Sequence, residues 1–320
     1  MNMKETPLII SETNVHQYIC LQDALDIVRE VFVDTAEANA INFPVVRETL
    51  SASSAVFGIK SAEYQRHSAV GLKAGGYFPS NALRGDTNHQ SFVILFDQDS
   101  GKPFAMIGGN LLTKLRTAAA SAISIDILAR KDTQTLAVIG AGAQAETHIA
   151  AALLVRSFDK IVLWNRGIDR AKALATRWKG DIPIEIVFST EEAVKDADVV
   201  ITVTNSTSPL VMKDWIKEGT HLSCMGADTI GKQEIDVGLL TCGKIFTDDQ
   251  TQSTTIGECQ SAFRADLINK AQISLLGNVM LGNTIGRENE KQVTIFDGTG
   301  VAAQDIAMAA RVVKHFNEAR

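Results

Sequence analysis

The stretch TLAVIGAGAQAETHIAAALLV, residues 135–155, decides the fold. An apolar strand-like run ends in a G-x-G-x-x-A turn, and an apolar helical run follows at once. In this context the first glycine permits a tight turn, the second lets a pyrophosphate approach the backbone, and the alanine keeps the helix close to the sheet. The helix N-terminus adds partial positive charge. A glycine turn that binds no dinucleotide is the alternative. The residues expected at the dinucleotide are Gly140, Gly142, Ala143, Gln144 and Ala145.

Strand-like and helix-like runs continue to alternate after this turn. Apolar runs at 160–165, 184–188 and 198–204 are separated by helical patterns at 169–178 and 190–197. Such βαβαβ alternation is typical of a parallel, doubly wound sheet. Further strands are expected at 220–226 and 244–248. The sequence therefore predicts an α/β fold of the Rossmann type, with a dinucleotide-binding domain over residues 116–300.

The end of the second expected strand bears on the choice of cofactor. An acidic residue there would accept hydrogen bonds from the ribose hydroxyls of NAD, but this chain has Asn165 and Arg166. Arg166 can pair with a 2′-phosphate, which favours NADPH. An arginine lying across the adenine face would suit NADH equally well. Both cofactors therefore stay open.

The sequence before the turn has a different organisation. A helical pattern at 21–39 is followed by strand-like runs at 42–50, 55–62, 68–78 and 90–109 with turn residues between them. Strands that succeed one another without helices indicate an antiparallel or mixed sheet. The amphipathic C-terminal segment is expected to return to a domain. We therefore predict an α+β substrate-binding and dimerisation domain formed by residues 1–115 with 301–320.

Composition excludes several classes of protein. A net charge of -6 and the absence of a basic run argue against nucleic-acid binding. No apolar stretch is long enough to cross a bilayer, and the N-terminus lacks a signal-peptide pattern. The four cysteines and six histidines form no metal-ligand spacing, so no metal is expected. A cytoplasmic enzyme acting on a small molecule fits this profile.

Three basic residues, two in the first domain and one in the helix that joins the two domains, are candidates for binding a carboxylate. Arg47 and Lys73 lie in strand-like runs near glycine or proline, and Arg116 lies in an alanine-rich helix. A guanidinium can grip a carboxylate through two parallel hydrogen bonds. Each residue taken singly is more often a solvated surface charge.

The motifs DSGKPFAMIGGNLLTKLRTAAASA (99–122), GAGAQA (140–145) and TIFDGTGVAAQD (294–305) together resemble the ornithine cyclodeaminase/μ-crystallin family. The order and spacing of these motifs match over essentially the whole chain. The resemblance implies a homodimer in which the first domain forms half of an intersubunit barrel. It also implies a C-terminal helix that returns to that domain.

The resemblance also assigns roles to residues. It implies that Arg47, Lys73 and Arg116 bind the substrate carboxylate and nitrogen region, with Lys73 also catalytic. Asp228, in CMGADTIGKQEID, matches the catalytic aspartate beside the nicotinamide. Further residues are expected near the cofactor: Thr113, Thr117, Met225, Gly226 and Thr299.

Within the family, the stretches at 77–91, 226–234 and 246–260 are most similar to the iminosuccinate reductases, which make L-aspartate. Hydride transfer to the imine carbon is the implied reaction. A dicarboxylate needs positive charge or donors at its far end, and Lys60 and His89 are candidates, although Lys60 can equally be an exposed strand residue. The alternatives are a reductase of cyclic ketimines such as pyrroline- or piperideine-2-carboxylate, an ornithine cyclodeaminase, an alanine dehydrogenase, and a crystallin-like binding protein.

Overall fold

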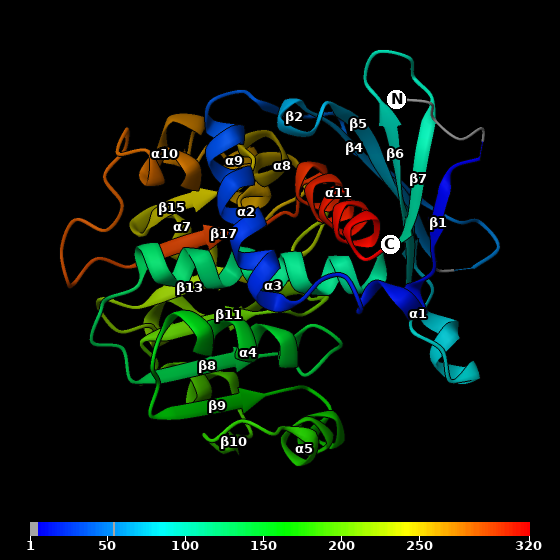
Figure 1. Ribbon diagram of the computed structural model, residues 1–320. Coiled ribbons are helices and arrows are strands. Elements are labelled where there is room, and N and C mark those ends of the chain that lie inside the picture. Colours follow the sequence, from blue (N-terminus) through cyan, green and yellow to red (C-terminus); the bar gives the residue numbers. More distant parts are fainter. Residues whose placement is uncertain (1–5, 54) are drawn as a thin grey trace. The chain divides into compact units, whose positions relative to one another are not determined.

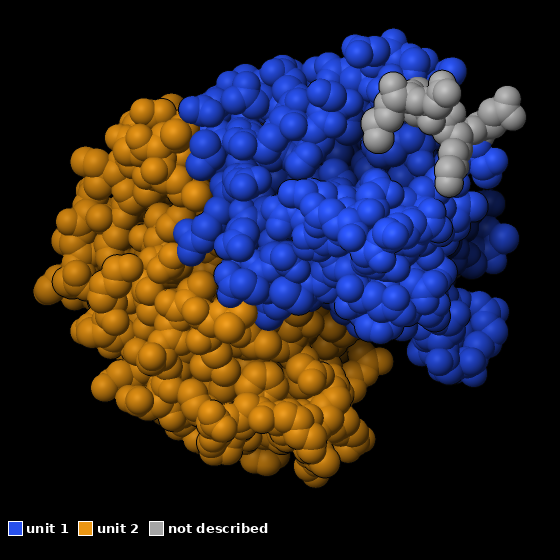
Figure 2. Space-filling model, in the orientation of Figure 1, with its two compact units in different colours: residues 1–116, 301–320 blue, residues 117–300 orange. Residues whose placement is uncertain are grey.

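The computed structural model describes residues 6–53 and 55–320, which form two compact units. Unit 1 comprises the chain up to Arg116 together with Val301–Arg320, and unit 2 comprises Thr117–Gly300. Figures 1 and 2 show the elements and the extent of each unit. Within the described residues, no helix is long and apolar enough to span a membrane.

Unit 1 is built on a seven-stranded mixed sheet. Its central strands follow one another as antiparallel neighbours in the order β7-β6-β5-β4, and β1 adds to the outer edge of β7 in parallel. Along the long strands β4, β5 and β6 buried residues alternate with more exposed ones, because successive side chains of a strand point to opposite faces of the sheet. The strands are β1 Leu8–Ile10, β2 Ala40–Asn42, β3 Val46–Thr49, β4 Val56–Tyr64, β5 Ala69–Tyr77, β6 His89–Asp97 and β7 Pro103–Gly108.

Two long helices cover one face of this sheet. The C-terminal helix α11, Ala302–Glu318, packs on β4, β5 and β6, and α2, Leu21–Ala36, packs on α11 (Figure 1). The close approach of α11 requires a glycine at position 71, because an added Cβ would lie 2.8 Å from Cγ1 of Ile306. The expected return of the C-terminal helix to the first domain is therefore seen. The remaining helices of unit 1 are α1 Glu12–Val15, η1 Gln65–His67 and η2 Pro79–Arg84.

Unit 2 contains an eight-stranded sheet whose neighbouring strands are all parallel. The strand order is β10-β9-β8-β11-β13-β17-β15-β16, which confirms the predicted doubly wound α/β fold. The strands are β8 Thr135–Ile139, β9 Lys160–Trp164, β10 Ile184–Ile186, β11 Val199–Thr202, β13 His221–Cys224, β15 Lys244–Thr247, β16 Ile273–Leu275 and β17 Thr294–Asp297. A separate two-stranded sheet pairs β12 Thr207–Val211 with β14 Gln233–Ile235.

Helix α3, Asn110–Leu128, begins in unit 1 and continues into unit 2. Its centre is buried almost without interruption, which explains why this segment is rich in alanine rather than amphipathic. The helices of unit 2 are α4 Ala145–Val155, α5 Ile168–Arg177, α6 Thr190–Val194, α7 Val237–Cys242, α8 Gln250–Thr255, α9 Gln260–Arg264, α10 Leu276–Met280, η3 Lys213–Trp215 and η4 Lys270–Gln272.

Candidate active site

Three basic side chains share the face of the unit 1 sheet that carries α11. Lys60 on β4 lies directly opposite Lys73 on β5, and both are buried, with 6% and 8% of their surface exposed. Arg47 on β3 pairs with Gly58, two residues before Lys60, so strand alternation places it on the same face. The burial of Lys60 excludes the alternative of an exposed strand residue. Like charges opposite each other destabilise a sheet, so this pair calls for a compensating anion.

The anion supplied by the chain itself is Asp305 of α11. Its fully buried carboxylate receives the Lys73 ammonium, with Nζ 2.9 Å from Oδ1 and 2.8 Å from Oδ2. Nε of Arg116, itself 5% exposed, lies 3.2 Å from the same Oδ1. Lys73 Nζ also donates to Oγ1 of Thr113 at 3.2 Å, which places Thr113 beside the basic cluster.

Asp305 is absent from the sequence-based site. The feature of the sequence that could have identified Asp305 is its position as the one acidic residue in the stretch VAAQDIAMAA, which has no other charged residue. A buried carboxylate in such a setting requires cationic partners. Sequence alone does not say which of the distant basic residues they are.

The electrostatics of this cluster make Lys73 easy to deprotonate. Burial, together with the neighbouring Arg116 charge, lowers the pKa of Lys73 to about 8, and the Asp305 carboxylate opposes that shift. Burial alone would raise the pKa of Asp305, but the charges of Lys73 and Arg116 outweigh it and hold that pKa below its usual value. An ammonium that loses its proton in mildly alkaline solution is suited to proton transfer near neutral pH.

His89 presents a hydrogen-bond acceptor. The backbone N–H of Ser91 donates to Oδ1 of Asn110 at 2.9 Å, which identifies that atom as the acceptor. Nδ1 of His89, 3.2 Å from the same oxygen, therefore carries the proton. Burial and the charge of Lys73 lower the pKa of His89 to about 4, so the ring is neutral and Nε2 keeps its lone pair. In this tautomer Nε2 has no proton to donate to the distal carboxylate of a dicarboxylate substrate. Lys60 is therefore the better candidate for binding that carboxylate.

The dinucleotide turn of unit 2 has the geometry that its sequence predicts. Gly140 has a φ of 114°, which favours glycine, and an added Cβ would lie 2.9 Å from the carbonyl oxygen of Val203. At Gly142 an added Cβ meets no atom within 4 Å, so space for a ligand is open above it. Ala145 is fully buried where α4 begins. Open space at a helix N-terminus fits a pyrophosphate.

Asn165, directly after β9, stabilises this turn through hydrogen bonds of its side chain. Oδ1 of Asn165 accepts a hydrogen bond from the backbone N–H of Ala141 at 3.0 Å, and its Nδ2 donates to the carbonyl of Gly167 at 2.8 Å. Asn165 therefore holds the turn in shape through its side chain. Arg166 next to it is exposed, and its pairing with a 2′-phosphate stays a prediction.

The other expected cofactor and catalytic residues of unit 2 follow neighbouring parallel strands. Met225 and Gly226 come directly after β13, with Asp228 two residues further, and Thr299 follows β17. Thr299 is fixed by Asp248, whose Oδ1 accepts from its Oγ1 at 2.6 Å and from its N–H at 3.0 Å. Thr117, in α3, is buried. Ligands of doubly wound sheets bind at the carboxyl ends of the strands, which is where these loops lie.

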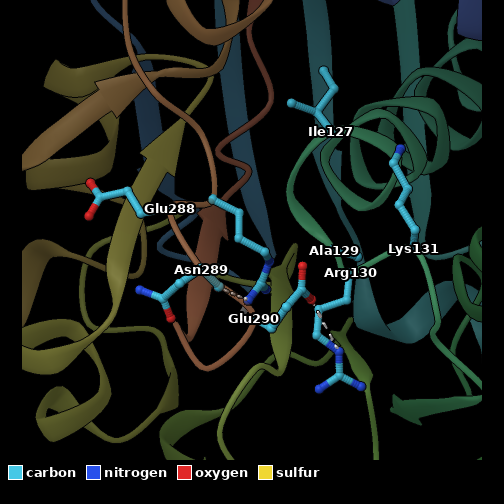
Figure 3. A pocket seen from close by; sticks show the side chains of 8 residues that line it. Ile127, Ala129, Arg130, Lys131, Glu288, Asn289 and Glu290 are labelled. Atoms are coloured by element: carbon cyan, nitrogen blue, oxygen red, sulfur yellow. Dashed lines mark hydrogen bonds and ion pairs between the residues drawn. The ribbon is translucent and has the colours of Figure 1, made fainter.

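A surface pocket of about 220 Å³ lies elsewhere on unit 2 (Figure 3). Arg130 and Arg287 line it, and both guanidinium groups are engaged, Arg130 with Asp198 at 2.9 Å and Arg287 with Oγ1 of Thr294 at 2.9 Å. These contacts lie at the amino ends of the parallel strands. The pocket is therefore at the wrong edge of the sheet for a dinucleotide.

A Rossmann sheet with a glycine turn, joined to a sheet that buries basic residues, defines a dinucleotide-binding protein equipped for an anionic substrate. The chain belongs to the ornithine cyclodeaminase/mu-crystallin family, whose sequence profile matches residues 5–319. The resemblance inferred from its motifs is thereby confirmed.

Individual relatives cover almost the whole chain. The iminosuccinate reductase of Paracoccus denitrificans is 44% identical over 96% of both chains, and its structure in complex with NAD+ superposes with a TM-score of 0.90, covering 98% of this chain and 97% of that one. The alanine dehydrogenase of Archaeoglobus fulgidus is 31% identical over 96% of this chain and 94% of its own. The Thermococcus litoralis Delta(1)-pyrroline-2-carboxylate reductase, crystallised with NADH and L-proline, is 25% identical over 98% of both chains, with a TM-score of 0.92. These complexes support NAD(H) as the cofactor of the fold.

Substitution of Gly142 by Val tests the dinucleotide turn. The new side chain enters the open space above the turn, and overfilling a fitted site costs about 1–3 kcal/mol. The Kd for NADH should therefore rise about tenfold to a hundredfold. Fluorescence titration measures the Kd. The melting temperature should be unchanged, because no atom of the chain lies within 4 Å of the added Cβ. An unaltered Kd would show that the dinucleotide does not cross this turn.

Substitution of Asp305 by Asn tests the control of Lys73 by its ion pair. Loss of the carboxylate leaves Lys73 beside Arg116 without its counter-charge, so the pKa of Lys73 should fall further below its value of about 8. If protonated Lys73 is needed for turnover, the alkaline limb of the kcat/KM profile should move to lower pH. Asp34→Asn, which removes a buried partner of Arg66 in the same unit, should destabilise the protein without moving that limb. An unmoved limb in Asp305→Asn would contradict the assignment.

Proposed function

We propose that the protein reduces iminosuccinate to L-aspartate with NADH or NADPH. The buried basic cluster of unit 1 is the observation that carries the proposal. Lys60, Lys73 and Arg116 are all buried, and Lys73 and Arg116 share the carboxylate of Asp305. Iminosuccinate brings two carboxylates, and basic groups at separate points of one cluster can bind both. The similarity to the Paracoccus denitrificans iminosuccinate reductase supports the same substrate.

Each residue has a distinct task in this reaction. Arg116 and Arg47 hold the α-carboxylate, and Lys60 holds the distal carboxylate. Lys73 and Asp228 handle the proton of the substrate nitrogen. Bound at the turn of unit 2, NAD(P)H supplies a hydride for the imine carbon. One hydride and one proton convert the C=N group to an amine, so the balance closes with NAD(P)+ as the second product.

A cyclic ketimine reductase is the second candidate, because relatives in Bacillus cereus and Thermococcus litoralis reduce pyrroline-2-carboxylate. That substrate carries a single carboxylate. It gives the buried basic residues one anionic group to bind, whereas iminosuccinate gives them two. The presence of three buried basic side chains, Lys60, Lys73 and Arg116, therefore favours the diacid.

A substrate comparison tests the proposal. Oxaloacetate with ammonia, the source of iminosuccinate, should give a higher kcat/KM than pyruvate with ammonia or pyrroline-2-carboxylate. Lys60→Met should lower kcat/KM for the diacid by more than about tenfold, because it removes one partner of a buried charge pair. It should leave the pyruvate reaction nearly unchanged. NADH oxidation at 340 nm, a wavelength at which only the reduced cofactor absorbs, measures each rate.

Lys102→Met, an exposed lysine after β6, is the matched control and should leave the ratio of the two rates unchanged. Equal losses with both substrates in Lys60→Met would show that Lys60 does not recognise the distal carboxylate. A higher kcat/KM of the native protein for pyrroline-2-carboxylate would replace the iminosuccinate proposal with the ketimine one.

We further propose that a second copy of the chain covers the sheet face opposite α11. Register places Ile9, Val46, Phe57 and Phe92 on that face, and their exposed fractions run from 38% to 66%. A contiguous apolar sheet face of this kind marks an interface. An archaeal alanine dehydrogenase that superposes with a TM-score of 0.91 was solved as a dimer with bound NAD.

Phe92→Glu tests the dimer. A charge on the covered face should shift the assembly from twice the chain mass of 34.5 kDa toward the monomer, as measured by light scattering after size exclusion. Phe188→Glu, which charges an 83% exposed phenylalanine of unit 2, should leave the mass unchanged. A native protein that elutes as a monomer at micromolar concentration would contradict this proposal.

A further inference from the structure

The loop that carries Asp228 is held by a clamp of two charged residues. Lys232 lies just before β14, and Glu234 lies within that strand. The side chains of both residues contact the loops that follow β11 and β13. Nζ of Lys232 donates to Oδ1 of Asn205 at 3.1 Å and to the carbonyl of Gly226 at 3.2 Å. Its third contact is with Oδ1 of Asp228, at 2.7 Å.

Glu234 contacts the same two loops. Its Oε1 accepts from the backbone N–H of Thr204 at 2.6 Å, and its Oε2 accepts from the N–H of Gly226 at 2.8 Å. Gly226 thus gives its N–H to Glu234 and its carbonyl to Lys232. An added Cβ at Gly226 would lie 2.2 Å from the carbonyl oxygen of Thr204, so the contact between the loops requires glycine.

The turn that bears Lys232 is itself fixed. Nε2 of Gln260, whose side chain is fully buried, donates to the carbonyls of Thr229 and Lys232 at 3.2 and 3.1 Å. Oε1 of Gln260 accepts from the N–H of Gly231 at 2.8 Å. A lysine whose backbone is anchored in this way delivers its ammonium to a defined point, although its side chain is flexible in general.

We propose that Lys232 is a positioning residue that fixes the carboxylate of Asp228 for the proton transfer, an inference that rests on the role assigned to Asp228 above. Lys232 and Oγ1 of Thr229, the latter at 3.1 Å, both contact Oδ1 of Asp228. Two contacts on one oxygen set the rotation of the carboxylate and thereby the direction of Oδ2. A displacement of about 1 Å at a reacting group is enough to slow a reaction about a hundredfold.

Lys232→Met removes the ammonium and keeps the length of the side chain. We expect kcat to fall about tenfold while KM for NADH changes less than about twofold, because the interaction acts in the transition state. Lys232→Arg, which retains a charge able to donate to Asp228, should recover most of the lost kcat. An unchanged kcat in Lys232→Met would overturn the proposal, as would an equal loss in Lys232→Arg.

Lys217→Met is the matched control, because Lys217 also contacts one aspartate and one backbone carbonyl, at the amino edge of the sheet. Its Nζ lies 2.8 Å from Oδ1 of Asp198 and donates to the carbonyl of Asp196 at 2.8 Å. This variant should lower thermal stability by a similar amount and leave kcat unchanged. A fall in kcat as large as that of Lys232→Met would mean that both lysines act through stability alone.

A double-mutant cycle with Asp228→Asn separates the failure of this inference from that of the proposed function. If Lys232 acts through Asp228, Lys232→Met should cost less than about twofold in kcat once Asp228 is Asn. A full tenfold loss in that background would overturn the inference. If Asp228→Asn alone leaves kcat unchanged, the role of Asp228 fails and the inference with it.

Amide hydrogen exchange of residues 225–229 adds a readout independent of turnover. Exchange should be faster in Lys232→Met than in the native protein and in Lys217→Met, because only the first variant releases the loop. Unchanged exchange in Lys232→Met would show that the ammonium does not hold the loop.

Discussion

The carboxylate of Asp305 is the interaction on which the candidate site depends. It joins α11 to Lys73 and Arg116, which precede it by 232 and 189 residues in the chain. Buried cations are costly unless they are paired, and Asp305 pairs with both Lys73 and Arg116. The close packing of α11 on β5 at Gly71 brings the carboxylate to this point. The C-terminal helix thus contributes a carboxylate to the candidate site in addition to packing on the sheet of unit 1.

In unit 2 a series of buried carboxylates accepts hydrogen bonds from backbone N–H groups. Asp297 accepts from the N–H of Glu258 at 3.0 Å, Glu258 accepts from the N–H of Glu234 at 2.8 Å, and Glu234 accepts from the N–H groups of Thr204 and Gly226. Burial raises the pKa of each of these three carboxyl groups, and the hydrogen bonds that they accept oppose the shift. Each acid therefore fixes the segment that carries the next one. The series leads from β17 to the loops where the cofactor is expected, which gives those loops rigid support.

Features that depend on neighbouring residues could be predicted from the sequence. Contacts between residues far apart in the chain could not. The turn at 140–145 and the alternating strands around it follow from short-range pattern, and the structure reproduces them. The insertion of β17 between β13 and β15 does not follow from such a pattern, because it pairs Thr294 with His221 and with Lys244, residues far apart in the chain. The partners of Asp305 were missed for the same reason. The hydrogen bonds of the Asn165 side chain to the backbone of Ala141 and Gly167 could not be predicted either, since they require the folded turn, and its contact with the cofactor stays a prediction.

The basic cluster of unit 1 links the arrangement of the sheet to the proposed choice of ligand. Lys60 and Lys73 lie directly opposite each other on β4 and β5, an arrangement in which like charges repel. If the proposed substrate binds here, a dianion would relieve more of this repulsion than a monoanion, and the site would discriminate through the repulsion that remains in the wrong complex. Burial is the main cause that lowers the pKa of Lys73, and the charges of Arg116 and Arg47 add to it. A dianion beside Lys73 would raise that pKa again, and substrate binding would then keep the ammonium protonated until its proton is needed at the substrate nitrogen.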